Sequence, residues 1–277
     1  MVMKLLDGSE LAGYIKERQA KQVRAIRQSW LVIPRLAIVR TGNNPVIDKY
    51  LQLKSIYGED IQIEVDIYTP TNEELLVQIE KLNKDKNTHG IIVQLPLADI
   101  NQTESAVNAV VPEKDVDGLG KNAVFTPATA MAINWLLVGY NIDLINKNIA
   151  IIGNGRLVGA PLTKLWTDMG LHVTVYDDQT KDLADVLQTS EVIVTATGVP
   201  GLIKSNMLRS GAIVVDAGTA SENDKIVGDV SAEVRDRDDL IITPIRGGVG
   251  PLTIAALFDN VITAARKIAD KKGQQDI

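Results

Sequence analysis

In the first half of the chain, short apolar runs alternate with amphipathic stretches, and the spacing of their apolar residues predicts secondary structure. Continuous or alternating apolar residues predict strands at 35–39, 61–67 and 90–94, and apolar residues at helical spacing predict helices at about 9–29, 46–57 and 72–86. Ser9 and Asn72 stand where the caps of two of these helices are expected. The turn cluster Thr-Gly-Asn-Asn-Pro between the first strand and the next helix is expected to be a loop.

The second half repeats this alternation. Apolar runs predict strands at 149–152, 173–176, 192–195, 213–216 and 240–242, with a helix after each of the first three, and longer helices are expected at 127–138 and 252–272. Regular alternation of strands and helices indicates parallel pairing with right-handed crossovers, which places ligand-binding loops at the carboxyl ends of the strands. The expected fold class is therefore α/β.

The length of 277 residues favours two domains, and the polar, glycine-rich stretch 112–120 is a candidate boundary or cleft-lining loop. We expect a first α/β domain at 1–121, completed by the C-terminal helix at 252–277, and a second, Rossmann-like domain at 122–251. The helices at 127–138 and 252–272 would link the two domains.

Residues 148–161 change abruptly from an apolar run to spaced glycines and then to a helical pattern that opens near Leu157. Gly153 and Gly155 allow a sharp turn and a close ligand approach, and Gly159 allows close packing of helix and strand. The unpaired N–H groups at a helix start favour a pyrophosphate. The spacing is G-x-G-x-x-x-G, one residue longer than the commoner fingerprint. The stretch predicts a dinucleotide site.

Three further segments fit such a site. Asp177 and Asp178 follow the second strand of this half, and the pairs 197–198 and 217–218 follow the third and fourth strands, where the backbone must pass close to a cofactor. Each glycine in those pairs also has a simpler interpretation, in which it closes the corner between a strand and a loop.

Charge and composition exclude several classes of function. The net charge is −6 without a dense basic cluster, which argues against nucleic acid or an anionic membrane as the main partner. There is no cysteine, and His89 and His172 are isolated, so disulfides and a metal centre are not expected. No signal peptide pattern and no membrane-length apolar run is seen, so a cytoplasmic location is expected.

Four side chains form a candidate catalytic group in the first half. Tyr50 and Lys54 are four residues apart and leave the same face of a helix. Gln94 leaves the carboxyl end of a strand, and Asp117 lies in the polar loop that is expected to border the same cleft. An amine, a phenol, an amide and a carboxylate can therefore converge, although a helical lysine is most often only a solvated charge.

Several strings of this sequence occur together in one enzyme family. They are Tyr50-x-x-x-Lys54, Gly90-Ile-Ile-Val-Gln-Leu-Pro-Leu97, Pro112-Glu-Lys-Asp-Val-Asp-Gly118, the Gly153 loop with Val158-Gly-Ala-Pro161, Val227-Gly-Asp-Val230 and Gly247-Gly-Val-Gly-Pro-Leu-Thr253. In order and spacing, over essentially the whole chain, they resemble the bifunctional methylenetetrahydrofolate dehydrogenase/cyclohydrolase family. The resemblance implies a homodimer of two α/β domains around a cleft, with folate in the first domain and a nicotinamide cofactor on the second.

The resemblance also implies roles for individual residues. The family oxidises methylenetetrahydrofolate to the methenyl cation and hydrolyses that cation to formyltetrahydrofolate. By matching position, Lys54 serves the cyclohydrolase step, Gln94 and Tyr50 assist and orient it, and Asp117 grips the pterin. The expected substrate-binding residues are Tyr50, Gln94, Leu95, Pro96, Asp117, Arg246, Gly247 and Gly248. The expected cofactor-binding residues are Gly153, Asn154, Gly155, Arg156, Val158, Gly159, Asp177, Asp178, Thr197, Gly198, Ala217 and Gly218.

The chain departs from the family pattern at four places. Ile47 replaces a serine near the folate, residues 127–132 replace Pro-Cys-Thr-Pro-x-Gly, and Arg246 replaces a proline, where its cation is either solvated or faces the glutamate tail of folate. Asn154 and Gly155 replace an arginine and a serine suited to the extra phosphate of NADP. With carboxylates at Asp177 and Asp178, this change predicts NAD over NADP.

Two other functions remain open from the sequence. The altered positions also fit a catalytically weakened or monofunctional relative that binds folate or dinucleotide, and the glycine loop alone fits a different Rossmann oxidoreductase. The combination of Lys54, Gln94 and Asp117 favours the bifunctional enzyme, because a protein that only binds its ligand has no need of the lysine.

Overall fold

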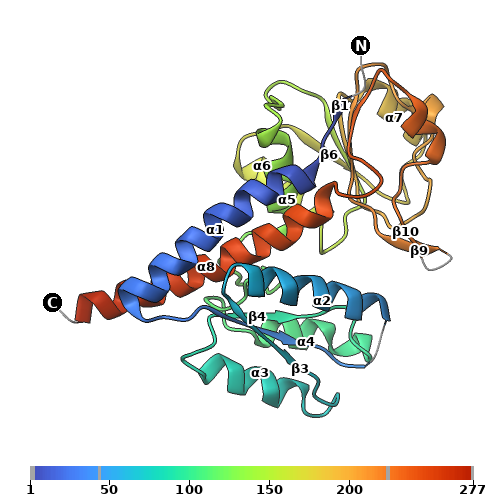
Figure 1. Ribbon diagram of the computed structural model, residues 1–277. Helices are drawn as coiled ribbons and strands as arrows, with labels where there is room; N and C mark the ends of the chain where they lie inside the picture. The colour runs from blue at the N-terminus through green and yellow to red at the C-terminus, as the bar shows by residue number, and fades with distance from the viewer. Residues whose placement is uncertain (1–3, 43–44, 223–224, 276–277) are drawn as a thin grey trace. The chain divides into compact units, whose positions relative to one another are not determined.

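The computed structural model describes residues 4–42, 45–222 and 225–275, and this chain forms two compact units (Figure 1). One unit combines the residues up to Ala12 with Thr129–Thr253, and the other combines Gly13–Ala128 with the described residues from Ile254 onward. We call them the six-stranded unit and the three-stranded unit after their main sheets. The chain passes between them within α1 (Gly8–Trp30), just after the start of α5 (Ala128–Gly139) and within α8 (Val249–Gln275).

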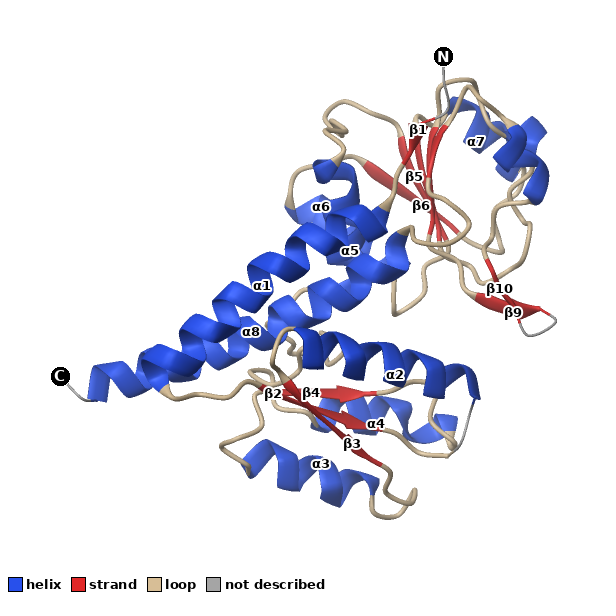
Figure 2. Ribbon diagram, in the orientation of Figure 1, coloured by secondary structure: helices blue, strands red, loops and turns tan. Residues whose placement is uncertain are grey.

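The three-stranded unit is built on a parallel sheet in the order β3-β2-β4 (Figure 2). Its strands are β2 (Arg35–Val39), β3 (Glu64–Tyr68) and β4 (Gly90–Val93), and its other elements are α2 (Pro45–Asp60), α3 (Leu75–Lys84), the 3-10 helix η1 (Ile100–Gln102) and α4 (Thr103–Ala109). On one face of the sheet, Ala37, Val39, Ile91 and Val93 pack against α3 and α4. Side chains alternate along a strand, so the fully buried Leu36 and Ile38 point to the opposite face.

A buried polar group joins α1, α2 and α8 within this unit. Gln19 is fully buried, and its Nε2 donates to the Ala255 carbonyl at 2.8 Å, while the Tyr57 hydroxyl donates to Gln19 Oε1 at 2.8 Å. The Tyr57 ring stacks on Phe258 with 5.0 Å between centroids. Burial, reinforced by the nearby Asp259 charge, raises the pKa of Tyr57, so its hydroxyl stays a donor. One amide therefore satisfies polar groups from two other helices.

The six-stranded unit contains a parallel sheet in the order β1-β11-β8-β7-β5-β6. These strands are β1 (Lys4–Leu5), β5 (Ile149–Ile152), β6 (Val173–Tyr176), β7 (Val192–Thr195), β8 (Ile213–Asp216) and β11 (Ile241–Ile242). The unit also contains α6 (Gly159–Asp168), α7 (Leu183–Thr189), the 3-10 helices η2 (Ser205–Met207) and η3 (Ala232–Asp236), and an antiparallel pair, β9 (Ala220–Glu222) with β10 (Lys225–Val227).

In each of the two main sheets, one strand lies between the two strands that follow it in the chain, so the order of strands reverses there. β5 pairs with β6 on one side and β7 on the other, and β2 likewise lies between β3 and β4. At such a point, the loops that leave the carboxyl ends of the two strands separate and form a crevice, which is where α/β proteins bind ligands. Each unit therefore has one predictable binding edge.

The sequence-based strands agree closely with the structure. The strands expected at 35–39, 149–152, 173–176, 192–195 and 213–216 are confirmed with those bounds, and the parallel α/β fold is confirmed in both main sheets. Fully buried parallel strands read as continuous apolar runs, which makes their ends visible. The strand expected at 61–67 is instead Glu64–Tyr68, because Ile61 and Ile63 lie in the turn that follows α2 and are buried there.

The predicted helix starts need correction. Ser9 does not cap α1: Asp7 does, because its Oδ1 accepts the backbone N–H of Ser9 at 2.8 Å. Nor does Asn72 cap α3, since Thr71 and Glu74 exchange hydrogen bonds there through side chain and backbone. The helix expected near Leu157 begins at Gly159. The helix expected after the strand at 192–195 is only the short η2.

The described chain contains no helix that is both long and apolar enough to cross a membrane.

The Gln19 cluster predicts a specific pattern of stability changes. Replacing Gln19 by Leu leaves the buried Tyr57 hydroxyl without its acceptor and should lower the free energy of unfolding by about 1–3 kcal/mol. Adding Tyr57→Phe removes the unpaired hydroxyl and should recover part of this loss, whereas Tyr57→Phe alone should destabilise the protein. Urea unfolding of the two single variants and the double variant measures the coupling, and strictly additive losses would contradict the pairing.

Candidate active site

Lys54 and Gln94 meet at the carboxyl end of the three-stranded sheet. Lys54 leaves α2, Gln94 directly follows β4, and Lys54 Nζ donates to Gln94 Oε1 at 2.8 Å. The backbone of Gln94 is held by its N–H, which donates to the Val39 carbonyl at 2.8 Å, and its side-chain Nε2 donates to the Leu95 carbonyl at 3.0 Å. The amide is therefore oriented with its oxygen toward the lysine.

The surroundings of Lys54 favour its neutral form. Burial lowers the pKa of the Lys54 amine, and the attraction of the Asp117 charge only partly opposes this effect. Burial likewise raises the pKa of the Asp117 carboxyl, against the pull of Lys54, and the nearby Asp115 carboxylate raises it further. An amine and a carboxylate are thus within electrostatic reach of each other in a partly desolvated place, where both can take part in proton transfer.

The loop that carries Asp117 is attached to the unit through its neighbours. The Lys114 ammonium donates to the carbonyls of Leu82, Asn83 and Asp85 at 2.6–2.9 Å, at the end of α3. The Asp115 carboxylate is buried and accepts the backbone N–H groups of residues 118–120, the closest from Gly120 at 2.8 Å. Of the three charges in Lys-Asp-Val-Asp, two are therefore structural, and Asp117 is the one that faces Lys54 electrostatically.

Tyr50 lies one helical turn before Lys54 on α2, and burial raises the pKa of its phenol. Ile47, one turn earlier again, is buried, at 8% exposed, and carries no hydroxyl, although the family resemblance implies one at this position. Leu95 and Pro96 continue from Gln94 in the loop after β4. All the predicted catalytic residues, and these two, belong to the three-stranded unit.

An ion pair that the sequence did not reveal lies at the same edge. Arg40 follows β2, is 9% exposed, and forms a salt bridge with Asp48 in the first turn of α2. It ties the helix that carries Tyr50 and Lys54 to the central strand. The only sequence signal is an arginine directly after an apolar strand.

In the six-stranded unit, the glycine loop follows β5 as predicted. Gly153 has φ +95°, and a Cβ there would lie 2.7 Å from the Ala196 carbonyl oxygen. A Cβ at Gly159 would overlap the Gly153 carbonyl, so α6 packs directly on the loop. Gly155 differs, because no atom lies within 4 Å of a Cβ built there. Packing does not require glycine at this position, and the missing side chain leaves the loop open to a ligand.

The start of α6 suits an anion. Val158 precedes the helix, and no side chain caps its first turn. Ala160 already donates its N–H to the Gly155 carbonyl at 3.1 Å, and Pro161 has no N–H, so it is mainly the positive end of the helix dipole that would favour a pyrophosphate. Asn154 and Arg156 lie exposed in the same loop. The residues present therefore fit a dinucleotide cofactor.

Asp177 and Asp178 follow β6 and are exposed. Asp177 closes a turn: its Oδ1 accepts the Gln179 backbone N–H at 3.0 Å, and its own N–H donates to Thr180 Oγ1 at 3.0 Å. One carboxylate oxygen of Asp177 is thus used to shape the loop. β6 lies beside β5, so both aspartates are at the same edge of the sheet as the glycine loop.

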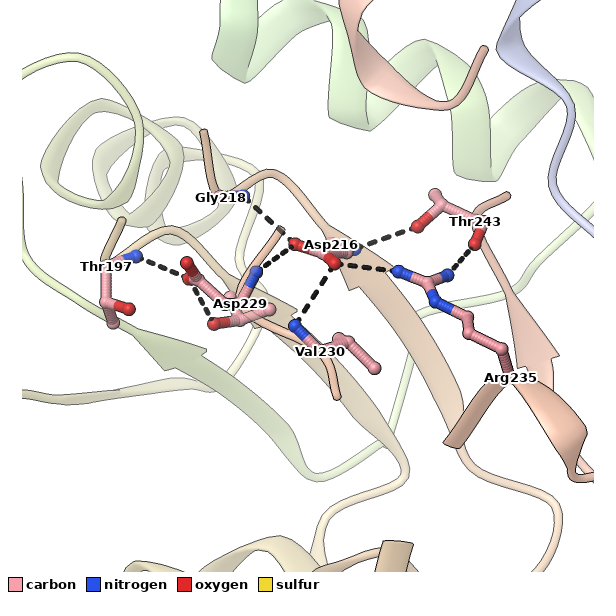
Figure 3. A network of polar contacts seen from close by, with 8 residues as sticks. Thr197, Asp216, Gly218, Asp229, Val230, Arg235 and Thr243 are labelled. Carbon is pink, nitrogen blue, oxygen red and sulfur yellow. Dashed lines mark hydrogen bonds and ion pairs between the residues drawn. The ribbon is translucent and has the colours of Figure 1, made fainter. Parts of the chain in front are cut away.

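A network of buried carboxylates holds the loops after β7 and β8 (Figure 3). Asp229 is fully buried, and its Oδ2 accepts Thr195 Oγ1 and the Thr197 N–H, each at 2.7 Å. Asp216, at the end of β8, accepts the N–H groups of Gly218, Asp229 and Val230 at 3.0–3.2 Å and pairs with Arg235 at 2.7 Å. Burial raises the pKa of Asp216, although its hydrogen bonds oppose the rise.

Two glycines make this network possible. A Cβ at Gly218 would overlap the Asp229 carboxylate, and a Cβ at Gly228 would overlap the Asp216 carboxylate. The Asp229 carboxylate therefore requires glycine at position 218, and the Asp216 carboxylate requires glycine at position 228. The predicted cofactor residues Thr197, Gly198, Ala217 and Gly218 lie in or next to these loops, and Gly198 has φ +70°. Sequence reasoning noted the Val-Gly-Asp-Val string but assigned no role to Asp216 or Asp229.

The predicted substrate residues Arg246, Gly247 and Gly248 belong to the six-stranded unit. Gly247 has φ +84°, and its carbonyl accepts the Ser9 N–H at 2.9 Å. A Cβ at Gly8 would overlap the Gly248 carbonyl, so this turn packs on the start of α1. Arg246 itself is exposed. The structure thus brings Lys54, Gln94 and Asp117 together in the three-stranded unit. Residues 246–248 belong to the six-stranded unit.

Within the described residues, no group of three or more His, Asp or Glu side chains is arranged to hold a metal ion.

Comparison with known families and structures gives one consistent result. Residues 6–117 match the catalytic domain of the tetrahydrofolate dehydrogenase/cyclohydrolase family, and residues 127–269 match its NAD(P)-binding domain. The chain is 35% identical over 280 aligned positions to the bifunctional protein FolD of Staphylococcus aureus strain Newman, which covers 96% of this chain and 98% of the relative.

Two solved structures are similar over nearly their full length. The bifunctional FolD enzyme from Campylobacter jejuni has 35% identity and a TM-score of 0.90, covering 96% of this chain and 99% of that one. The Trypanosoma brucei dehydrogenase-cyclohydrolase, solved with NADP and an inhibitor, has 28% identity and a TM-score of 0.90, covering 96% and 98%. The chain therefore belongs to the tetrahydrofolate dehydrogenase/cyclohydrolase family.

Proposed function

We propose that this chain carries out both reactions of its family, with the folate-directed chemistry performed by Lys54, Gln94, Tyr50 and Asp117. The observation that carries the proposal is the hydrogen bond from Lys54 to Gln94, made by an amine whose pKa is lowered by burial and which lies within reach of the Asp117 charge. A protein that only binds folate has no use for a buried lysine whose pKa is lowered and whose amine is held by a neutral acceptor.

Asp117 would hold the pterin. A carboxylate accepts two parallel N–H bonds from an aminopyrimidine edge, and such charge-assisted pairs are strong and directional. The desolvation that raises the pKa of Asp117 also strengthens hydrogen bonds to its ionised form once the substrate supplies donors. Tyr50, one turn from Lys54, would border the same substrate.

Lys54 would serve the hydrolytic step as a base. A water molecule attacks the methenyl carbon, the carbon–oxygen bond forms as the carbon–nitrogen π bond opens, and Lys54 takes the proton that the water loses. The carbon–N5 bond of this adduct then breaks, N5 gains a proton and the new hydroxyl loses one to become the formyl oxygen, so that one proton is released overall. Gln94 Oε1 holds the amine in place while it accepts that proton. The cationic substrate itself disfavours a second positive charge, so it lowers the pKa of Lys54 further.

The six-stranded unit would hold the nicotinamide cofactor. Its pyrophosphate would sit at the uncapped start of α6, with the loops that contain Thr197 and Gly218 beside it. The bound cofactor supplies the hydride acceptor, and the chain contributes binding and orientation. Exposed carboxylates after β6 support NAD as the preferred form, since they accept a ribose hydroxyl and repel a ribose phosphate.

The second candidate function is a dehydrogenase with weakened or absent cyclohydrolase activity. The buried Ile47 favours it, since the family hydroxyl at this position on the folate-facing helix is missing. Incubation of the protein with methylenetetrahydrofolate and cofactor distinguishes the two. A bifunctional enzyme produces methenyl absorbance that then decays faster than it does without enzyme, and a monofunctional one produces absorbance without faster decay.

A homodimer and a cytoplasmic location stay predictions from the family resemblance and the sequence, respectively.

Lys54→Met should separate the two activities. Hydrolysis of methenyltetrahydrofolate should fall by about a hundredfold or more, the usual contribution of general base catalysis, while hydride transfer stays measurable. Lys49→Met, an exposed lysine on the same helix, is the matched control and should retain both activities. Equal loss of both activities in Lys54→Met would mean that this residue is structural.

The pH dependence of hydrolysis follows from the lowered pKa. Neutral Lys54 is the active form, so the rate should rise with pH and level off above the pKa of Lys54. That pKa should lie below the value of about 10.4 for unperturbed lysine. Initial rates of methenyl decay, corrected for uncatalysed hydrolysis at each pH, give this profile. A rate that increases only above pH 10, or a limb that survives in Lys54→Met, would contradict the assignment.

Replacing both Asp177 and Asp178 by Ser should shift the cofactor preference toward NADP. One charge-assisted hydrogen bond gained or lost corresponds to about tenfold or more in the ratio of kcat/KM values for NAD and NADP. Steady-state kinetics with both cofactors measure this ratio. Asp185→Ser, an exposed carboxylate of α7 in the same unit, is the control. A wild-type preference for NADP would refute the proposal, as would an unchanged ratio in the double variant.

A further inference from the structure

Asn260 of α8 connects both arms of the segment that carries Asp117. Its Nδ2 donates to the Val116 carbonyl at 2.9 Å and to the Thr126 carbonyl at 3.0 Å. Val116 is the residue directly before Asp117, and Thr126 lies two residues before the start of α5, at the far end of the loop. One amide group therefore bridges the beginning and the end of this loop, from a helix more than 130 residues further along the chain.

The first arm is also fixed by packing. Val116 is fully buried, and its methyl groups lie where a Cβ at Gly90 would come within 2.9 Å. Val261, next to Asn260 on α8, lies 3.2 Å from the same point. In addition, the Ile91 N–H donates to the Lys114 carbonyl at 2.7 Å. The side chain of Val116 is thus pressed onto β4, and its carbonyl points to Asn260.

The two arms lie close together directly after Asp117. Gly118 has φ +70°, and a Cβ there would be 2.6 Å from the Phe125 carbonyl oxygen. The backbone directly after Asp117 is therefore packed against the second arm, without room for a side chain. The two hydrogen bonds from Asn260 set the separation of the arms, because each N–H of the amide is used for one arm.

We infer that Asn260 is a positioning residue for folate binding, which fixes the backbone of Asp117 so that its carboxylate meets the pterin edge in the correct orientation. The inference rests on the role proposed above for Asp117. A carboxamide suits this task, because it supplies two N–H donors from one planar group. An aspartate or a leucine of the same size supplies none. The contribution is made through Asp117 and involves no contact of Asn260 with the reacting atoms.

The test compares Asn260→Leu with Thr263→Ala, an exposed position on the same helix. Loss of two hydrogen bonds that orient a binding group should raise the KM for methylenetetrahydrofolate about tenfold. The KM for the cofactor and the kcat of the dehydrogenase should change less than twofold, since only binding of the folate is affected. Thr263→Ala should leave all three values unchanged. Asn260→Gln, which keeps both N–H donors on a side chain one methylene longer, should give an intermediate KM, and it decides the test if Asn260→Leu does not fold.

A purely structural role would give a different result. It would lower the melting temperature of Asn260→Leu and the yield of active enzyme while leaving the folate KM of the folded fraction unchanged. That outcome, in either Asn260 variant, overturns the inference.

Asp117→Asn separates failure of this inference from failure of the proposed function. If Asp117→Asn binds folate like the wild type, the role of Asp117 is wrong. If Asp117→Asn loses folate binding while Asn260→Leu does not, only the positioning role is wrong. If Asn260 acts through Asp117, the double variant should have the folate KM of Asp117→Asn within about twofold, whereas multiplied effects would overturn the inference.

Discussion

The hydrogen bond between Lys54 and Gln94 is the interaction around which the candidate site of the three-stranded unit is organised. An amine that must lose a proton has to be kept out of bulk water, held by an acceptor and left without a full ion pair, because a close carboxylate partner would keep it charged. Here the acceptor is a neutral amide, and Asp117 affects Lys54 through its field. Keeping these groups in place requires that α2, the end of β4 and the Asp117 loop are each attached firmly to the sheet.

Those attachments are made mainly by side chains that bind backbone groups. Lys114 donates to three carbonyls at the end of α3, Asp115 accepts the N–H groups of residues 118–120, and Gln94 is held through its own backbone N–H. Such contacts leave the reactive side chains available while they fix the loops that carry them. Charges in a loop of this kind are therefore not equivalent: Lys114 and Asp115 build the loop, and Asp117 interacts electrostatically with Lys54.

In the six-stranded unit, buried carboxylates likewise hold the loops by binding backbone groups. Asp216 and Asp229 each bind backbone N–H groups of loops at the carboxyl edge of the sheet, and Gly218 and Gly228 provide the space that each needs. Arg235 compensates one of the two charges, with its guanidinium on Asp216 at 2.7 Å. A buried carboxylate without such partners would lower the stability of the fold, so loss of one partner is expected to weaken the whole network. Its effect is a rigid edge against which a dinucleotide can be oriented.

The sequence by itself determined most strands of the two main sheets and the parallel fold class, and it selected the residues of the candidate site. Strands such as Ile149–Ile152 and Val192–Thr195 were predictable because burial on both faces leaves an uninterrupted apolar run between polar residues. Gln94 and the Gly153 loop could be located because they follow such strands directly, and Lys54 could be paired with Tyr50 by helical spacing alone. Each of these predictions uses a pattern that lies within a few neighbouring residues.

Only the tertiary structure decided which polar residues hold the site in place. Asp7, and not Ser9, caps α1, and the helix expected after β7 is only η2. Arg40 with Asp48, Asp229 with Thr195 and Asn260 with Val116 join elements between 8 and 144 residues apart. No periodicity connects such partners, because their pairing depends on where the folded backbone brings a donor within hydrogen-bonding distance of an acceptor that burial has removed from water.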